Sequence, residues 1–430
     1  ATINSITVGK GANSVAGNTV LGESALDASV TGGNNTAIGK EAMTTLTSGT
    51  SNIAVGKGSL ELNTTGSSNS ALGHSSLKNN TTADNNTAVG KSALQQNTTG
   101  TQNVAVGANA LDANTTADSN TAVGYEALTA NTTGDNHVSF GRYSLRANTT
   151  GINNSAIGFN ALKANTTASN NTALGNEALT ANTTGANNVG IGTGALGANT
   201  TASNNVAVGH GCLDFNTTGS ENNAVGANSL DANTTGSNNN AFGQGALGAN
   251  TTASNNSAFG QSALAANTTG FRNTAIGSRS AITTTTGNSN VSVGYESLEF
   301  NTTGSQNVAI GHQALEANTT ASSAVAIGYQ ALAANTTGAE NIAIGAFSLD
   351  ANTTGGSNIA IGVSALGSNT TANNNVALGY DALKLNTEGQ SNTAAGYAAL
   401  DANTTGNDNV AYGRDALGKN TTASENVAVG

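Results

Sequence analysis

A 17-residue repeat runs through almost the whole chain and limits the possible folds more than any other feature. The motif Asn-Thr-Thr-Gly, or a close variant of it, recurs every 17 residues from Asn63 to Asn420 without an insertion or deletion. The consensus is N-T-T-G-x-N-N-V-A-V-G-x-x-A-L-x-A, and its residues are called repeat positions 1 to 17. A unit this short cannot close a hydrophobic core alone, so neighbouring units must stack to bury one.

Some repeat positions are nearly constant, whereas others vary freely. Position 11 is Gly at all 25 occurrences, position 7 is Asn in 23 of 25, and position 15 is Leu in 22 of 24. Positions 9 and 14 hold Ala or Ser with few exceptions, and position 10 is always apolar. Positions 12 and 16 hold charged, aromatic and small residues alike. We expect the constant positions to be buried or constrained by the backbone, and the variable ones to face solvent.

The repeat length predicts an all-β fold, a parallel β-solenoid (β-roll) of about 25 coils, and we expect it to be trimeric. Helical repeats need about 33 residues, so they are excluded. Positions 7 to 10, such as residues 307–310, predict a short strand, and the Gly at position 11 predicts a turn. Positions 1 to 5 predict a second turn. Positions 12 to 17 fit a second strand or a turn of helix, and we favour the strand.

One elongated array is predicted rather than several domains. Residues 1–21 are expected to form a variant starting coil, and residues 22–430 an uninterrupted solenoid. At a strand spacing of about 4.8 Å, stacked coils would form a rod. Because no capping sequence follows the last repeat, we expect the chain to belong to a longer protein or to stack end to end.

Alternation along the strand places positions 9 and 10 on opposite faces. We expect the large residues at positions 10 and 15 to fill the coil. The small residues at positions 9 and 14 then either fit a thin interior or line a face where three chains pack side by side, and we favour the second interpretation. Asn at positions 1 and 7 predicts amide ladders between neighbouring coils.

Composition excludes several classes of protein. Charged residues are 9% and aromatic residues 3% of the chain, which argues against an enzyme-like domain with a large aromatic core. The single cysteine excludes a disulfide within the chain. The net charge of −11 gives no basic footprint for nucleic acid, and no apolar run is long enough for a membrane span.

Motifs that could carry chemistry are explained better by the repeat. The glycines of residues 190–197 lack the helix and the Lys-Ser/Thr pair of a phosphate loop. Three of the four histidines, His74, His210 and His312, share position 12 but lie coils apart, and His137 occupies position 7, so no metal site is expected.

Three further features are given structural interpretations. Cys212 lies in the small-residue column at position 14 and is predicted to be a packed thiol. The twenty N-T-T triplets match a glycosylation acceptor, but their periodicity favours a structural ladder. The acidic pairs at position 16, Asp214 with Asp231 and Glu299 with Glu316, are interpreted as solvated faces rather than cation sites. We therefore predict no catalytic, cofactor-binding or metal-binding residue.

The strings N-T-A-I-G-K-E-A at residues 35–42 and N-V-A-I-G-H-Q-A-L at residues 307–315 resemble the head-domain repeats of trimeric autotransporter adhesins. The longer form with A-N-T-T-G is similar to repeats of bacterial and phage tail-fibre-type proteins. This resemblance implies a trimeric, left-handed parallel β-roll. The chain departs from the head-domain pattern by a longer coil, with the extra residues in the N-T-T-G turn.

The favoured function is a structural extracellular fibre or filament shaft with an adhesive role, on a cell surface or a virion, without catalysis. Its expected partners are copies of itself, in a homotrimer or an end-to-end filament, and a host-surface receptor or glycan that contacts positions 12, 13 and 16. The alternative is an ice-binding solenoid that presents Thr and Asn ladders. Adjacent Thr64 and Thr65 would point apart, which disfavours it. A solenoid enzyme is disfavoured because the strict repeat leaves no inserted loops.

Overall fold

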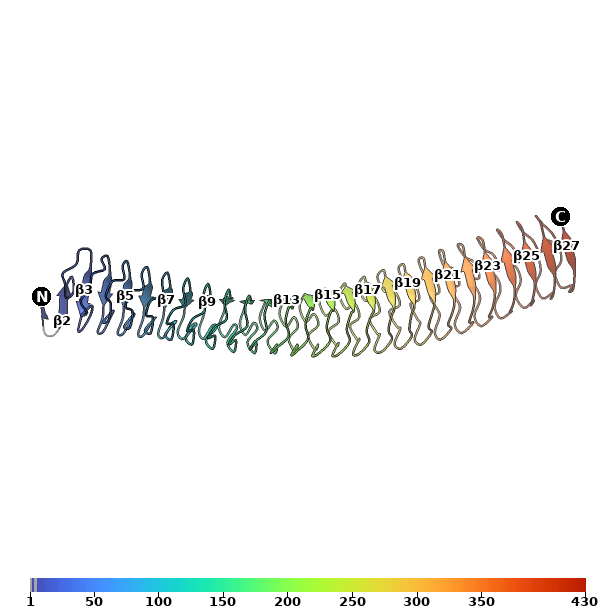
Figure 1. The fold of residues 1–430 in the computed structure, drawn as a ribbon. Helices are drawn as coiled ribbons and strands as arrows, with labels where there is room; N and C mark the ends of the chain where they lie inside the picture. Colours follow the sequence, from blue (N-terminus) through green and yellow to red (C-terminus); the bar gives the residue numbers. More distant parts are fainter. Residues whose placement is uncertain (1, 4–5) are drawn as a thin grey trace. The chain divides into compact units, whose positions relative to one another are not determined.

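The computed structural model describes residues 2–3 and 6–430, which fall into two compact units, unit 1 (Ala1–Thr218) and unit 2 (Gly219–Gly430). Each unit is a parallel β-solenoid with a 17-residue coil, and the two contain about 24 turns together (Figure 1). The described residues contain no helix, and hence none that could cross a membrane. The predicted all-β solenoid is confirmed.

Nearly all strands are three residues long and occupy repeat positions 8 to 10. The strands of unit 1 are β1 Thr2–Ile3, β2 Ile6–Gly9, β3 Thr19–Gly22, β4 Thr36–Ile38, β5 Ile53–Val55, β6 Ser70–Leu72, β7 Thr87–Val89, β8 Val104–Val106, β9 Thr121–Val123, β10 Val138–Phe140, β11 Ser155–Ile157, β12 Thr172–Leu174, β13 Val189–Ile191 and β14 Val206–Val208. The strands of unit 2 are β15 Asn223–Val225, β16 Asn240–Phe242, β17 Ser257–Phe259, β18 Thr274–Ile276, β19 Val291–Val293, β20 Val308–Ile310, β21 Val325–Ile327, β22 Ile342–Ile344, β23 Ile359–Ile361, β24 Val376–Leu378, β25 Thr393–Ala395, β26 Val410–Tyr412 and β27 Val427–Val429.

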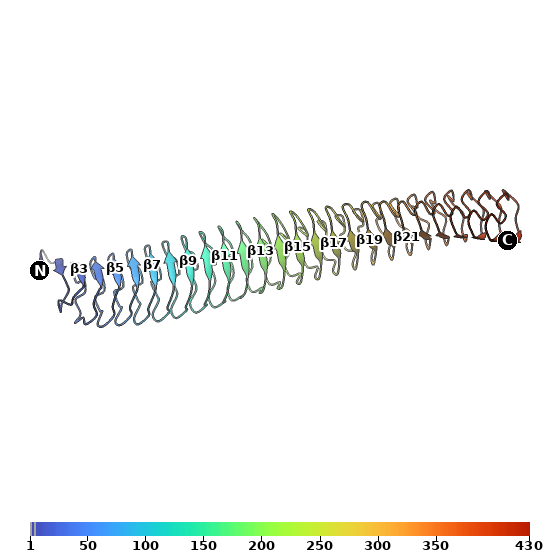
Figure 2. The same ribbon diagram turned by 90° about the horizontal axis from the view of Figure 1, so that it is seen from above.

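Within each unit, every strand from β3 onward pairs in parallel with the equivalent strand of the next coil. Residues 17 apart are partners, as in Val138 with Ser155 between β10 and β11. Figure 2 shows the strands of successive coils side by side. At the start of unit 1, β1 pairs with β2 and β2 with β3 in antiparallel fashion. Residues 1, 4 and 5 of the predicted starting coil lie outside the described residues. The constant register places identical repeat positions next to one another.

The strands bury position 9 and expose positions 8 and 10, opposite to our expectation for position 10. In β6, Ala71 is buried whereas Leu72 is 50% exposed. In β10, Phe140 is 55% exposed although it is the largest residue of its strand. The prediction that large residues at position 10 fill the coil is therefore wrong, and only the Leu at position 15 is interior.

The Ala and Ser columns at positions 9 and 14 lie inside the coil and face each other across it. Where position 9 is Ser139, its hydroxyl donates to the carbonyl of Ser144 at position 14, at 2.9 Å. A Cβ placed on Gly190 at position 9 would lie 3.3 Å from Cγ of Leu179 at position 15. A methyl group at position 9 is therefore enough to fill the space beside the leucine. The interpretation of these columns as a contact between chains is wrong, because they fit a thin interior.

Positions 12 to 17 form a run of turns, so the favoured second strand and the helical alternative are both wrong. Positions 13 and 15 adopt positive φ even where they are not glycine, as in Ser75 (55°) and Leu77 (52°). The backbone N–H of Ser75 donates to Lys57 in the preceding coil, and that of Leu77 to Ala93 in the following coil, both at 2.9 Å. Hydrogen bonds between coils therefore continue around the side that has no strands, which compensates for the unfavourable φ of a bulky residue.

The invariant glycine at position 11 is required by both conformation and space. Gly158 has φ of 140°, and a Cβ there would collide with the carbonyl oxygen of Gly175 in the next coil. Only glycine adopts this backbone without strain. The predicted turn after each strand is confirmed.

Buried asparagine ladders join the coils at positions 1 and 7, as predicted. At position 1, Nδ2 of Asn165 donates to Oδ1 of Asn148 at 2.9 Å and to the carbonyl of Ala168 at 3.0 Å. At position 7, Oδ1 of Asn154 accepts the backbone N–H of Asn171 at 3.0 Å. These side chains are fully buried, so each ladder bond satisfies a polar group that water cannot reach.

Between Asn63 and Asn420, three residues replace a ladder asparagine: Thr284 at position 1, and His137 and Ala324 at position 7. Thr284 replaces Asn at position 1, and Oδ1 of Asn267 in the preceding coil is left buried without a hydrogen-bond partner. His137 replaces Asn at position 7 but keeps both contacts. Its Nε2 lies 2.7 Å from the carbonyl of Gly151, and its Nδ1 accepts the backbone N–H of Asn154 at 3.2 Å. His137 is therefore neutral, with the proton on Nε2.

Thr284→Asn is expected to stabilise the protein by about 1–3 kcal/mol, because it supplies a donor to the orphaned Oδ1 of Asn267. Guanidinium unfolding followed by circular dichroism measures the change. The matched control is Ser289→Asn, which adds the same side chain at exposed position 6 of the same coil. The control should change the free energy of unfolding by less than about 0.5 kcal/mol. Equal effects of the two variants would contradict the ladder argument.

The stability of the protein is expected to fall on acidification in a way that depends on His137. Burial lowers the pKa of His137 below its ordinary value of 6.5. The unfolded chain then binds the proton more readily, so stability is complete above 6.5 and declines as pH falls toward the folded pKa. Unfolding midpoints at pH 7.5 and 5.0 should differ less in His137→Asn, which restores the ladder residue, than in the parent chain. The same pH dependence in both proteins would contradict this assignment.

Candidate functional site

Outward side chains occur on the strands, on the turns that follow them and in the N-T-T-G turn, where Thr65 and Ser68 are exposed. Positions 8 and 10 lie on the outer face of the strands, and positions 12, 13 and 16 lie on the turns. Tyr125 and Phe159 at position 12 are 44% and 42% exposed. The aromatic residues of position 12 therefore face solvent, as expected, whereas position 13 is half-buried or buried in most coils, as at Ser75, and position 16 includes the buried Glu299.

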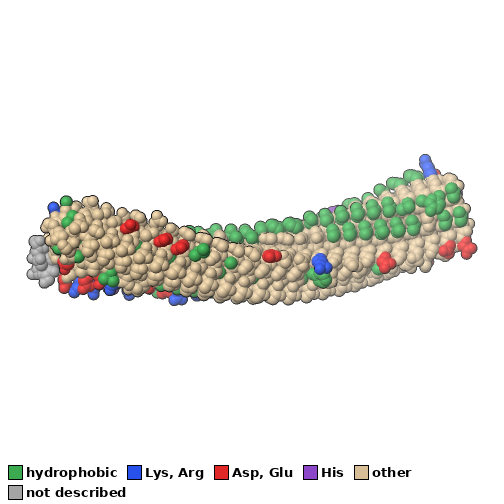
Figure 3. Space-filling model, in the orientation of Figure 1, with side chains coloured by type: hydrophobic (Ala, Val, Ile, Leu, Met, Phe, Trp, Pro, Cys, Tyr) green, Lys and Arg blue, Asp and Glu red, His purple; other side chains and the backbone are tan. Residues whose placement is uncertain are grey.

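A continuous apolar surface, called the strand-face patch, covers strands β19 to β24 of unit 2. Every outward residue of these strands is Val, Ile or Leu, and all are half-buried or exposed. Figure 3 shows rows of hydrophobic side chains over this part of the unit. The patch consists of Val291, Val293, Val308, Ile310, Val325, Ile327, Ile342, Ile344, Ile359, Ile361, Val376 and Leu378.

Stacked rings extend this apolar surface at position 12. His312 stacks on Tyr295 and on Tyr329, with ring centroids 5.5 and 5.3 Å away. Tyr329 in turn contacts Phe347 edge to face at 5.2 Å. Tyr295, His312 and Tyr329 occupy position 12 and Phe347 occupies position 13, on the turns that follow strands β19 to β22.

A cluster of cations and rings lies on unit 1 across neighbouring coils. The ring of Tyr143 has Arg142 Cζ at 4.5 Å, Arg146 Cζ at 5.0 Å and Lys163 Nζ at 5.8 Å from its centroid. Tyr125 and Phe159 flank Tyr143, with centroids at 5.7 and 6.4 Å. The whole chain has only 13 Lys and Arg residues, so three within 22 residues are a local concentration.

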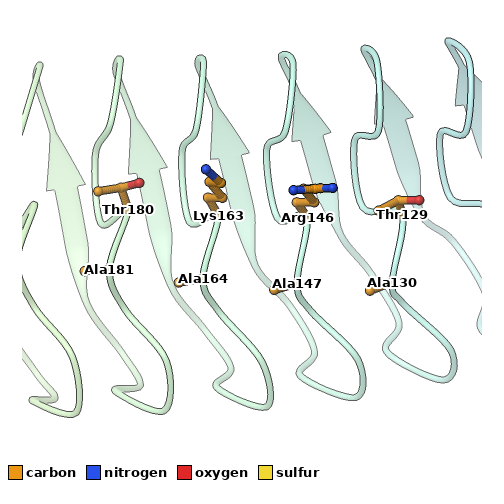
Figure 4. Close-up of a pocket in the computed structure, with 8 residues that line it drawn as sticks. All are labelled: Thr129, Ala130, Arg146, Ala147, Lys163, Ala164, Thr180 and Ala181. Carbon is orange, nitrogen blue, oxygen red and sulfur yellow. The ribbon is translucent and has the colours of Figure 1, made fainter.

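Beside this cluster, a shallow open groove of about 620 Å³ runs over four coils (Figure 4). One row of its lining comes from position 16 and the other from the alanines of position 17. The lining residues are Thr129, Ala130, Arg146, Ala147, Lys163, Ala164, Thr180 and Ala181. The groove thus has a floor of methyl groups and a polar row with two cations at its centre.

The positive charge of the cluster is only partly compensated. Arg146 Nε lies 2.8 Å from Oε2 of Glu126. Arg142 donates to the hydroxyl of Tyr143 at 2.9 Å, and this hydrogen bond raises the pKa of Arg142. Among the described residues, no carboxylate forms an ion pair with Lys163. An anion could therefore approach Lys163 without displacing a partner.

An acidic cluster on unit 2 contains one of the two predicted acidic pairs. Carboxylate oxygens of Glu296, Glu299 and Glu316 lie within 4.8 Å of one another. Arg279 pairs with Glu299 and with Glu296, and Gln313 donates to Glu296 at 3.1 Å. Arg279, Glu296 and Glu299 thus form an ion-pair network, whereas Glu316, among the described residues, accepts only from Gln313, at 3.4 Å. Glu299 is only 3% exposed, so the interpretation of this pair as a solvated face is wrong for Glu299. The other pair, Asp214 and Asp231, is divided between the two units.

The remaining candidate residues take structural places in the coil. Cys212 is fully buried in the interior column, so the predicted packed thiol is confirmed. Residues 190–197 follow the ordinary coil, with Ile191 in β13 and positive φ at Gly192 and Gly194. Ladder asparagines such as Asn165 are buried with their amides bonded, which confirms the structural reading of the N-T-T triplets.

Reasoning along the sequence missed both the strand-face patch and the cationic groove. The signal for each is present, because residues 17 apart become neighbours. Arg146 and Lys163 differ by 17, as do Tyr125, Arg142 and Phe159. Reading each variable column for charge and ring content, rather than only for variability, would have found the cluster.

Neither a known protein-family model nor a curated protein matches the sequence. The function therefore has to be argued from the surfaces described above. Two of them are distinctive, the strand-face patch of unit 2 and the cationic groove of unit 1.

Proposed function

We propose that the chain is a structural, non-catalytic shaft that assembles with further copies of itself and has an adhesive role. The observation that carries this proposal is the strand-face patch. Six neighbouring coils present only Val, Ile and Leu at both outward strand positions. Contiguous apolar surfaces of this kind mark interaction sites in soluble proteins.

A second copy of the chain is the partner that this surface fits best. The patch has no charged residue in its two columns, so it selects an apolar partner rather than a charged one. Strands at about 4.8 Å spacing give the patch a length of roughly 24 Å and a flat, regular relief. An identical patch has the same spacing, and its side chains interdigitate with the first. Three copies around one axis bury the patch of every copy, which is the arrangement that we propose.

The coil itself suits a shaft. Hydrogen bonds between coils occur on the strand side and on the turn side alike, as in Gly73 to Val55 and Leu77 to Ala93. The strict repeat leaves no inserted loop that a protease could cut or that could carry a catalytic group. The chain has no proline and few Lys or Arg residues, which also suits resistance to proteolysis.

The adhesive role and the extracellular location belong to the same proposal. Variable side chains of position 12 project from a constant scaffold, together with exposed ones at positions 13 and 16 such as Phe347 and Arg146, which is the division expected of a display surface. The resemblance of residues 35–42 and 307–315 to head-domain repeats of trimeric adhesins supports a place on a cell surface or virion.

Ice binding is the alternative, and the geometry favours it less. The hydroxyl of Thr64 at position 2 donates to the carbonyl of Thr81 in the next coil at 2.9 Å. It is therefore engaged within the solenoid, and only the single exposed row at position 3, such as Thr65, faces water. The ice-binding hypothesis needs two neighbouring rows of Thr hydroxyls on one face of the solenoid, and a single row does not provide them.

The purified chain is expected to sediment at equilibrium as a species of about three times 41.9 kDa. Val325→Lys combined with Ile359→Lys should convert it to a monomer, because both residues lie in the strand-face patch and a buried unpaired charge opposes association. Circular dichroism should show that the variant stays folded, since both side chains point outward.

Thr87→Lys combined with Thr121→Lys is the matched control. These residues occupy the same repeat position, also two coils apart, on strands of unit 1 outside the patch. The control should keep the mass of the parent chain. A monomeric parent chain would contradict the proposed assembly. Very large polydisperse species would also contradict the trimer and would indicate end-to-end growth instead.

A further inference from the structure

We propose that the groove of unit 1, centred on Arg146 and Lys163, binds an acidic oligosaccharide whose carboxylate or sulfate groups pair with these cations. The inference rests on the adhesive part of the proposed function and specifies its ligand. It does not require the chain to be trimeric, because every lining residue belongs to one unit of a single chain.

The cations are placed to receive an anion. Arg146 and Lys163 occupy position 16 of adjacent coils, so their side chains emerge next to each other in one row (Figure 4). The ring of Tyr143 lies within 6 Å of Arg142, Arg146 and Lys163 and holds the three cations together. Arrangement before binding lowers the cost of ordering flexible side chains when a ligand arrives.

The other lining residues match a sugar ring. Ala130, Ala147, Ala164 and Ala181 form a flat methyl floor on which the apolar C–H face of a pyranose can lie. Thr129 and Thr180 stand at the two ends of the cationic row. Their hydroxyls can both donate to and accept from sugar hydroxyls. The groove therefore offers methyl groups, hydroxyl groups and cations. They match the C–H face, the hydroxyls and the acidic groups of an acidic saccharide.

An extended peptide is disfavoured because the alanine N–H groups along the floor of the groove already donate to the next coil. The N–H of Ala147 donates to Lys163, and the N–H of Ala164 donates to Thr180, both at 3.1 Å. An extended peptide gains its affinity by pairing with free main-chain groups at a sheet edge. The alanine amides of the floor are therefore not available to a strand-like peptide, and the side chains of position 16 are left to recognise a ligand.

A nucleic acid is disfavoured by the short extent of the positive charge. The basic residues of the row occupy two coils, a span of about 5 Å. Thr129 and Thr180 follow on either side, and Asp112 occupies position 16 of the coil beyond Thr129. A nucleic acid needs a positive track along its backbone, whereas this site matches one or two acidic groups on a short chain.

The test is titration calorimetry of the full chain with four probes at low and high salt. Hexagalacturonate carries carboxylates, a heparin-derived hexasaccharide adds sulfates, maltohexaose is neutral, and hexaglutamate is an acidic peptide. We expect one or both acidic saccharides to bind, more weakly at high salt. The difference between them identifies which acid the site prefers. The neutral sugar and the peptide should not bind measurably.

Lys163→Thr is the decisive variant, because Thr180 occupies position 16 in the next coil and Thr129 occupies it two coils before, so the fold accepts Thr at this position. It should weaken binding of the acidic saccharide about tenfold through loss of a charge-assisted contact. Lys78→Thr is the matched control. It makes the same change at position 16 of a coil that does not line the groove. There, Lys78 Nζ lies 3.3 Å from a carboxylate oxygen of Glu61, and binding should be unchanged.

Three results would overturn the inference: no binding of either acidic saccharide, equal binding of maltohexaose or hexaglutamate, or equal losses in Lys163→Thr and Lys78→Thr. Tyr143→Ser gives an independent check, since Ser75 and Ser92 occupy the same repeat position at similar φ. It should also weaken binding by releasing the cations. If the chain is monomeric but binds the saccharide, only the proposed self-assembly is contradicted. If the chain is trimeric but binds no saccharide, only the proposed binding site is contradicted.

Discussion

Each coil has room inside for a single layer of side chains, and the hydrogen bonds between coils depend on that layer. Ala at position 9 meets Leu at position 15 across the coil, as the small gap between Gly190 and Leu179 shows. The asparagines beside them use amide groups to bond one coil to the next, as Asn165 does with Asn148. A core this thin buries little apolar surface, so satisfied polar ladders contribute to stability alongside hydrophobic burial. A missing ladder partner, as at Thr284, therefore matters more here than on a surface.

The same thin interior explains where the larger apolar residues go. In the coils after β3, the interior accepts only Gly, Ala or Ser from the strand, so Val, Ile and Phe at position 10 face outward. Where position 8 is also apolar, as in β19 to β24, the outer face becomes a continuous apolar surface. Where the turn positions collect cations and rings, as around Tyr143, the outer face becomes a charged groove. One constant scaffold thus presents different surfaces on its two units.

The sequence predicted the period, the strand, the glycine turn and the asparagine ladders, but it placed the strand faces the wrong way round. Alternation shows only that Ala71 and Leu72 point to opposite sides, and hydrophobicity favours the larger residue inside. Constancy was the better signal, because position 9 hardly varies while position 10 ranges from Ala to Phe and Tyr. Position 7 shares the parity of position 9, so a buried Asn69 already implied a buried Ala71.

The sequence by itself determined the 17-residue coil and hence the register, because an unbroken period allows each residue to pair only with its equivalent in the next coil. Only the tertiary structure decided which face of the strand is buried and that positions 12 to 17 form turns rather than a strand. Both outcomes depend on the width of the coil, which is set jointly by the strand and by the turns opposite it. Leu77 at positive φ fills the interior from the turn side and leaves space only for a small side chain such as that of Ala71. The width of the coil cannot be inferred from any single stretch of the sequence.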